Sequence, residues 1–174
     1  MIKLIAIISL LTVGTIVSIY SLSVTDINNG TININNYRGK KILLVNTATG
    51  NTQANSQFAA LQQLYQQHQD SLVVIAFPSN SFGHELGTNE QIKALMQGTY
   101  GVSFPIAVKS WVRGDSANII YQWLGSKLQN EVMDWKTNKD FQKYLIDKSG
   151  SIVARFDSSV SPISASIQNA INNY

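Results

Sequence analysis

Phe77-Pro78-Ser79-Asn80-Ser81-Phe82-Gly83, followed by Gly87-Thr88-Asn89-Glu90, is the stretch of sequence that decides the fold. It begins at the end of a continuous apolar run over residues 72–77, which is typical of a strand buried on both faces. Pro78 ends that strand because proline has no backbone N–H to donate. Residues 88–91 then match a capping box, which predicts a helix. The apolar face of that helix is expected to contain Ile92, Leu95 and Met96.

Upstream of this stretch, the pattern predicts a hairpin, a buried strand and a helix. Residues 19–24 and 31–34 alternate apolar with polar side chains, and Asn28-Asn29-Gly30 joins them. Asn-Gly is a strong hairpin signal because both turn positions need positive φ. The apolar run over residues 42–45 predicts a second strand buried on both faces. The following helix is indicated by the spacing of Phe58, Leu61, Leu64 and Tyr65, with Asn55 or Ser56 as its N-cap.

Downstream of it, the alternation of strands and helices continues. Residues 104–108 predict a short strand, and residues 119–124 have the spacing of a helix. Two strands over 141–147 and 151–156 are expected to form a hairpin. The last helix is expected to begin with Ser161 as N-cap and Pro162 at its first position, and to bury Ile163, Ile167 and Ile171. This order predicts a thioredoxin-like α/β sandwich with an N-terminal β-hairpin.

Residues 1–17 are expected to be an export signal or an N-terminal membrane anchor. Lys3 gives a short positive region, and residues 4–17 are apolar apart from Ser9, Thr12, Gly14 and Thr15. Extended to Tyr20, the run nearly reaches the roughly 20 residues that a spanning helix needs. The sequence therefore predicts one globular domain over residues 18–174, either exported (periplasmic or extracellular) or anchored to a membrane by its N-terminus.

Composition narrows the class of protein. The chain has 174 residues, of which 44% are hydrophobic and 13% charged, with a net charge of +3. Its Lys and Arg residues are scattered, so no nucleic-acid-binding stripe is predicted. It contains no cysteine, which excludes a disulfide within it, a Cys-ligated metal site and a lipidated N-terminal cysteine. No cofactor is predicted.

Six fragments of the chain, in order and at near-matching spacing, resemble the glutathione peroxidase family. The opening stretch is similar to that family's second signature, Phe-Pro-Cys-Asn-Gln-Phe-Gly, with Ser79 in place of Cys and Ser81 in place of Gln. The other fragments are residues 18–20 with 37–40, 43–48, 100–105, 114–115 with 121–124, and 141–147. The resemblance covers nearly all of residues 19–171 and implies a thioredoxin-like fold. The short segment from Ser126 to Lys139 lacks the long insertion of tetrameric members, which implies a monomer.

The resemblance also implies where the family's catalytic groups would lie. The family reduces hydroperoxides by thiolate or selenolate attack on the O–O bond, and Gln, Trp and Asn side chains stabilise the anion. Carried over, the nucleophile falls on Asn51, with Gly50 or Thr52 as alternatives, and the three partners fall on Ser81, Lys139 and Asp140. Trp135, four residues upstream of Lys139, is a possible substitute for the missing Trp. No cysteine stands near Met96 and Gln97, where thioredoxin-dependent members carry a resolving cysteine.

The sequence is therefore consistent with two functions. The favoured one is a glutathione-peroxidase-like protein without thiol peroxidase activity, with a non-catalytic binding role outside the cytoplasm. The alternative is a peroxidase of the oxidative stress response that reduces hydroperoxides with glutathione or thioredoxin.

Other polar residues give weaker signals. A hydrolytic site built on Ser81 with Lys139 or Asp140 is disfavoured, because neither an oxyanion-hole motif nor a G-x-S-x-G elbow accompanies them. His84 and Glu85 supply only two potential ligands, so a metal site is not expected there. His68 is expected to be solvated. The packing of Trp111, Trp123 and Trp135 is favoured over a binding role.

Overall fold

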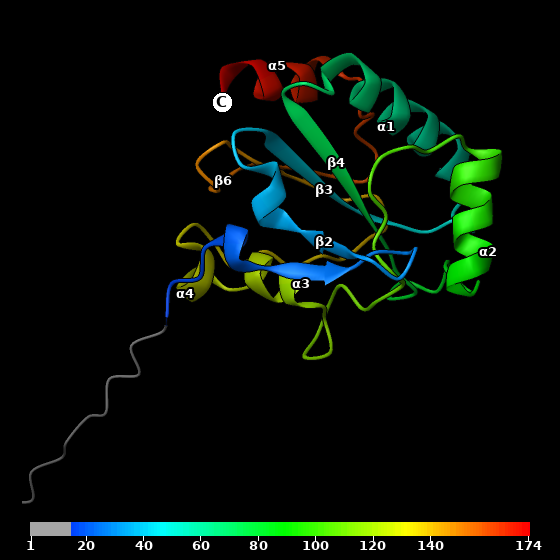
Figure 1. The fold of residues 1–174 in the computed structure, drawn as a ribbon, viewed down its shortest axis with the longest axis horizontal. Coiled ribbons are helices and arrows are strands. Elements are labelled where there is room, and N and C mark those ends of the chain that lie inside the picture. Colours follow the sequence, from blue (N-terminus) through cyan, green and yellow to red (C-terminus); the bar gives the residue numbers. More distant parts are fainter. Residues whose placement is uncertain (1–14) are drawn as a thin grey trace, which may run out of the picture.

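A four-stranded sheet in the order β4-β3-β5-β6 forms the centre of the protein (Figure 1). The computed structural model describes residues 15–174. β3 (Lys41–Thr47) and β4 (Leu72–Pro78) are parallel, whereas β5 (Lys143–Ile146) is antiparallel to β3 and β6 (Ile152–Phe156) is antiparallel to β5. All seven residues of both β3 and β4 are buried, as the two apolar runs predict.

Two layers cover the sheet, and alternate residues of β3 point into them. Leu43 and Val45 share a core with α1 (Ala54–His68) and α5 (Ala165–Asn173). On the other face, Ile42 and Leu44 share a core with α3 (Ile119–Leu124) and the N-terminal hairpin. Figure 1 shows α1 and α5 above the sheet, and α3 and the hairpin below it. The predicted thioredoxin-like α/β sandwich is confirmed.

The N-terminal hairpin is shorter than its sequence pattern suggests. β1 (Ser23–Thr25) pairs antiparallel with β2 (Thr31–Asn33). The flanking segments Ile19–Ser21 (η1) and Ile34–Tyr37 (η2) are 3₁₀ turns instead of strand. In the turn, Asn29 has a φ of 64°, whereas Gly30 is not left-handed. The hairpin itself is thus confirmed, but not the expectation of positive φ at both turn positions.

The helix after the second buried strand begins with the predicted capping box. In α2 (Asn89–Lys93), the Thr88 side chain accepts a hydrogen bond from the Gln91 backbone, and the Gln91 side chain accepts one from the Thr88 backbone. The helix continues into a π-helical turn, η3 (Ala94–Thr99). Ile92 and Met96 are buried as expected, but Leu95 is 40% exposed. Because a π turn is wider than an α turn, the apolar face does not continue in α-helical register.

Several predicted boundaries were wrong. α1 begins at Ala54, with Gln53 at the N-cap position instead of Asn55 or Ser56. α5 begins at Ala165 after Ser164, because Ser161 to Ser164 form a turn in which the Ser164 backbone donates to the Ser161 carbonyl. In consequence Ile163 is 41% exposed.

Two predicted strands also differ from the structure. Residues 104–108 form only isolated bridges, through Ile106 and Ala107. β5 starts at Lys143 and not at residue 141, because Phe141 has a φ of 58°, which is incompatible with a strand. A short helix that the sequence pattern did not predict, α4 (Lys127–Asn130), follows α3.

Within residues 15–174, no helix is both long enough and apolar enough to cross a membrane. Most of the expected export signal or anchor at residues 1–17 lies outside the described residues. The domain boundary at residue 18 remains a prediction.

Candidate functional site

Three segments meet at the end of the sheet where β3 and β4 finish. Residues 48–53 lead from β3 into α1, residues 79–87 follow β4, and residues 137–141 precede β5. The last of these is held against β3, because the Asn46 side chain donates to the Lys139 carbonyl (2.8 Å) and the Phe141 backbone donates to the Asn46 carbonyl (2.7 Å). The carboxyl ends of parallel strands are where α/β proteins commonly place their sites.

A polar pocket of about 290 Å³ lies between these segments. It is lined by Asn51, Thr52, Gln53, Phe82, His84, Asn138, Lys139, Asp140 and Ser158. Three of the four predicted positions, Asn51, Lys139 and Asp140, are therefore brought together. We call this cavity the polar pocket.

Asp140 connects Asn51 to the loop after β4. Its Oδ2 accepts a hydrogen bond from Nδ2 of Asn51 (2.9 Å) and lies 2.6 Å from Nδ1 of His84. The Asp140 side chain is 1% exposed and that of His84 is 51% exposed. The second carboxylate oxygen, Oδ1, is buried without a hydrogen-bond partner. The pocket thus holds a buried carboxylate that is only partly satisfied.

Ser81, the position that matches the family's Gln, does not line the polar pocket. It is 4% exposed, and its hydroxyl accepts hydrogen bonds from the Ser79 hydroxyl (2.9 Å) and the Val112 backbone (3.1 Å). The first contact lies within the loop after β4, and the second holds that loop against the segment around Val112. The Ser81 side chain is therefore part of the interior and not of the site.

Trp135 lies in a different place from its expected role as a substitute. It lines a separate cavity of about 800 Å³ beside Tyr121 and Lys136. Its ring packs edge-on against Tyr144, at 6.4 Å between centroids, and the guanidinium of Arg155 lies 5.7 Å from its centre. The structure thus separates Trp135 from the polar pocket and gives it a packing role.

His84 and Glu85 point to different partners and do not form a joint site. Glu85 is buried, and its carboxylate accepts from the Thr49 backbone (2.7 Å) and the Thr49 hydroxyl (2.6 Å). Burial raises the pKa of Glu85, and the two Thr49 donors oppose that rise. Among residues 15–174, no group of three or more His, Asp or Glu side chains is placed to hold a metal ion. His68, expected to be solvated, is half-buried and contacts the Gln168 side chain (2.9 Å).

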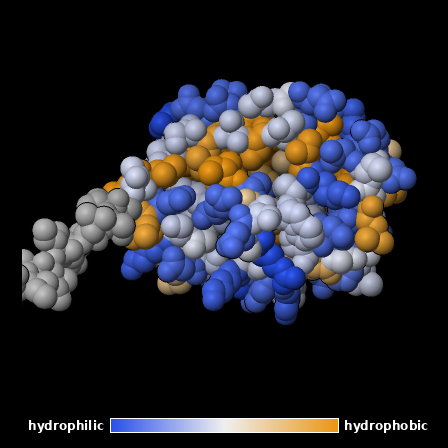
Figure 2. Space-filling view, turned by 90° about the horizontal axis from the view of Figure 1, so that it is seen from below, coloured by the Kyte–Doolittle hydropathy of each residue, from blue (hydrophilic) through white to orange (hydrophobic). Residues whose placement is uncertain are grey.

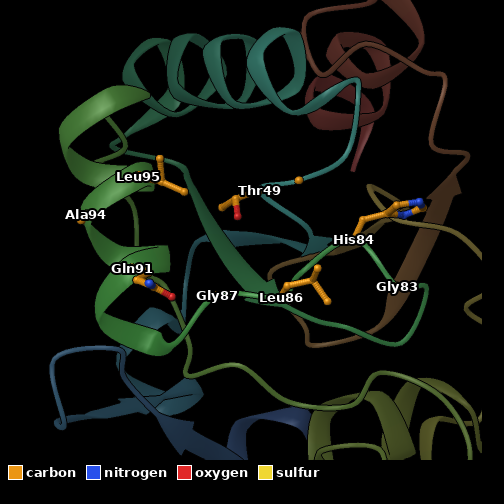
Figure 3. Close-up of a pocket in the computed structure, with 9 residues that line it drawn as sticks. Thr49, Gly83, His84, Leu86, Gly87, Gln91, Ala94 and Leu95 are labelled. Carbon is orange, nitrogen blue, oxygen red and sulfur yellow. The ribbon is translucent and has the colours of Figure 1, made fainter.

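A second, mostly apolar cavity of about 550 Å³ lies next to the polar pocket. Gln91, Ala94 and Leu95 form its helical wall, and Thr49 and Leu86 lie across from them (Figure 3). Leu86 is 82% exposed. His84 contributes to both cavities, and Figure 3 shows its ring pointing away from the helical wall.

A close backbone contact fixes the position of His84. The backbone N–H of Gly50 donates to the His84 carbonyl at 3.0 Å. A Cβ at position 50 would stand 2.7 Å from that carbonyl oxygen. Only glycine lets the two segments approach this closely without a shift.

Lys143 is a buried lysine that contacts Ser158, one of the residues lining the polar pocket. Its side chain is fully buried, and Nζ donates to the carbonyls of Phe141 (2.8 Å) and Ser158 (3.5 Å). Burial lowers its pKa to about 7, and the charge of Asp157 opposes that change. The residue therefore links the segment before β5 to the loop after β6.

Sequence reasoning missed the pairing of His84 with Asp140. A histidine held by a buried carboxylate is the arrangement by which many enzymes orient a base. In the described residues, however, His84 makes no hydrogen bond to a serine or threonine hydroxyl. A carboxylate at position 140, where the family has an amide, indicates that a hydrogen-bond donor must lie nearby. The sequence does not indicate which residue supplies that donor.

Comparison with known proteins identifies relatives of both the sequence and the fold. The profile described as glutathione peroxidase matches residues 19–125. "Glutathione peroxidase-like peroxiredoxin GPX5" from Chlamydomonas reinhardtii is 38% identical over 150 residues, covering 83% of this chain and 90% of that protein. "Probable glutathione peroxidase 8-B" from Xenopus laevis is 38% identical over 136 residues, covering 77% of this chain and 63% of that protein. The crystal structure of Trgpx in apo form matches with a TM-score of 0.67 and 28% identity, over 91% of this chain and 97% of that chain.

Proposed function

This chain belongs to the glutathione peroxidase family, and we propose that it has kept the family's fold while losing its thiol peroxidase chemistry. In this proposal the protein acts as a non-catalytic binding domain. The observation that carries it is the residue at the nucleophile position. That residue is Asn51, an amide hydrogen-bonded to the buried carboxylate of Asp140.

The chemistry of peroxide reduction supports this proposal. Thiol peroxidases need a thiolate that is ionised near neutral pH and can pass through a sulfenic acid. An amide nitrogen does neither, and the 174 residues contain no cysteine that could take its place. The carboxylate of Asp140 would also disfavour an anion beside it, because like charges at short range repel.

A binding role is supported by the two adjoining cavities. The polar pocket has about 290 Å³ and its apolar neighbour about 550 Å³. Cavities of this size are typical of sites for small ligands.

The experiment that tests the loss of activity is a coupled peroxide-consumption assay. Purified full-length protein is given hydrogen peroxide or an organic hydroperoxide, with glutathione and glutathione reductase in one arm and thioredoxin and thioredoxin reductase in the other. The Chlamydomonas relative serves as the positive control. We expect the rate of a no-protein blank in both arms. Thiol-dependent turnover that scales with protein concentration would favour the alternative function, a hydroperoxide reductase of the oxidative stress response.

We also propose that the domain is located outside the cytoplasm, exported or anchored by its N-terminal segment. The support is the apolar run over residues 4–17 after Lys3. Protease added to intact cells is expected to degrade the protein, while a cytoplasmic marker survives. The same treatment of spheroplasts, whose outer membrane is opened, tests a periplasmic location. Protection in both preparations until the cells are lysed would contradict a location outside the cytoplasm, and the mass of the purified protein would show whether the N-terminal segment is cleaved.

A further inference from the structure

The described chain is hydrogen-bonded to the domain from Val17 onward. The backbone N–H of Val17 donates to the Gln129 carbonyl at 3.1 Å. The Val17 carbonyl accepts a hydrogen bond from the indole N–H of Trp123 at 2.6 Å. Trp123 is 2% exposed and belongs to the core of the domain. Val17 is therefore fixed to the domain through both its backbone N–H and its carbonyl.

Exposed apolar side chains gather around this attachment. They are Ile16 (61% exposed), Leu128 (69%), Val132 (37%) and Met133 (50%), four of the ten exposed large hydrophobic residues among the described ones. We call these four the exit patch. Figure 2, seen from below Figure 1, shows hydrophobic side chains beside the point where the described chain begins.

The exit patch is rigidly built. The Asn130 side chain accepts from the backbones of Val132 (2.8 Å) and Met133 (3.0 Å), and donates to the Trp123 carbonyl (2.8 Å). Asn130 is buried, so one amide holds the Val132–Met133 segment and α3 together. Solvent-exposed apolar side chains on a fixed loop are typical of a surface that contacts an apolar partner.

We propose that the exit patch rests against a lipid bilayer, with its four side chains at the boundary between headgroups and acyl chains. This rests on the anchoring role proposed above for the N-terminal segment. Val17 belongs to the domain, so the apolar residues left to enter a bilayer are 4–16, which directly precede it. Without a linker, a run inserted in a bilayer brings the exit patch to the bilayer surface.

Charges around the patch indicate that this contact is hydrophobic and not electrostatic. Lys127 and Lys136 are exposed nearby, and so are Glu131 and Asp134. These two positive and two negative charges balance one another around the patch. The contact is therefore expected to be insensitive to salt and to anionic lipid content, unlike that of a polybasic segment.

The absence of cysteine in the chain makes a direct test possible. Leu128→Cys carries one environment-sensitive fluorophore on the patch, and Gln63→Cys carries the same fluorophore on exposed α1 across the sheet. Full-length proteins are mixed with phosphatidylcholine vesicles, with and without anionic lipid, at low and high salt. We expect a blue shift for the Leu128 label only, equal in every mixture. A second variant, Leu128→Ser with Met133→Ser, is expected to have a vesicle partition coefficient at least about tenfold lower than that of the unmodified protein.

Each other outcome overturns the inference in a distinguishable way. If the protein floats with vesicles while the Leu128 label stays in water, anchoring stands and the exit patch faces elsewhere. If the protein does not associate with vesicles, the anchoring proposal and this inference both fail. If the label shifts without lipid as protein concentration rises, the patch contacts a second copy of the chain. A shift only with anionic lipid at low salt would show electrostatic attraction instead.

Discussion

Nδ1 of His84 lies 2.6 Å from Oδ2 of Asp140, and this contact joins the loop after β4 to the segment before β5. The carboxylate is buried whereas the imidazole is half exposed. Loss of the imidazole would leave the carboxylate with Asn51 as its hydrogen-bond donor and its Oδ1 still unpaired. The pair therefore contributes to stability mainly by satisfying Asp140.

His84→Ala is expected to lower the free energy of unfolding by about 1–3 kcal/mol, because it leaves a buried charged group less well satisfied. Chemical denaturation measures the change. His68→Ala is the control, since His68 contacts only a neutral amide, and it is expected to cost less. A double-mutant cycle with Asp140→Asn isolates the pair. Additive effects in that cycle would show that the contact has no energetic role.

Gly50→Ala is expected to destabilise the protein by about 1–3 kcal/mol, because the added Cβ would meet the His84 carbonyl oxygen at 2.7 Å. Gly98→Ala is the matched control, since a Cβ there meets nothing within 4 Å. The two melting temperatures give the comparison. Equal stability of the two variants would mean that the loop moves freely away from residue 50.

Lys143→Met is expected to remove a pH dependence of stability. The pKa of Lys143 is about 7 in the folded protein, because the side chain is buried, against 10.5 ordinarily. Between these values the unfolded chain binds the proton and the folded chain does not. Lys143 therefore makes the free energy of unfolding rise with pH across that window, by at most about 1.4 kcal/mol per pH unit.

Urea denaturation from neutral to alkaline pH checks this. The stability of the unmodified protein minus that of Lys143→Met should increase with pH. Lys139→Met, which removes an exposed lysine, is the control. A constant difference for Lys143→Met would show that the buried lysine keeps its proton.

Asn51→Cys alone is expected to give little or no peroxidase activity. The carboxylate of Asp140 lies where it would raise the pKa of a thiol at position 51, and Ser81 is turned into the interior. Asn51→Cys with Asp140→Asn should therefore react faster with iodoacetamide at neutral pH than the single variant. The pH profile of alkylation measures both thiol pKa values. Robust peroxide turnover by the single variant would mean that the pocket is still competent.

The fold could be predicted because its signals are local and consistent. The buried strands appear as continuous apolar runs, and the Thr88 capping box marks a helix start. Errors arose where tertiary geometry overrides local preference. The positive φ of Phe141 delays β5, and the π turn leaves Leu95 exposed to a cavity.

Part of the candidate site was predicted from the family motifs and not from local sequence patterns. Motif position placed Asn51, Lys139 and Asp140 together, because residues that match a motif inherit its place in the fold. It failed for Ser81, whose short side chain hydrogen-bonds internally where a longer one could extend outward. It gave no indication of the partner of Asp140, since His84 is 56 residues away in sequence.

The bond between Asn51 and Asp140 also bears on how this site can evolve. Restoring the nucleophile first would place a thiol beside a carboxylate that has lost a hydrogen-bond donor. Restoring the amide first would weaken the tie to His84 and return no activity. Under the proposed loss of peroxidase chemistry, each single substitution back toward the family pattern costs stability or gains no activity, so a return to that chemistry would pass through unfavourable intermediates.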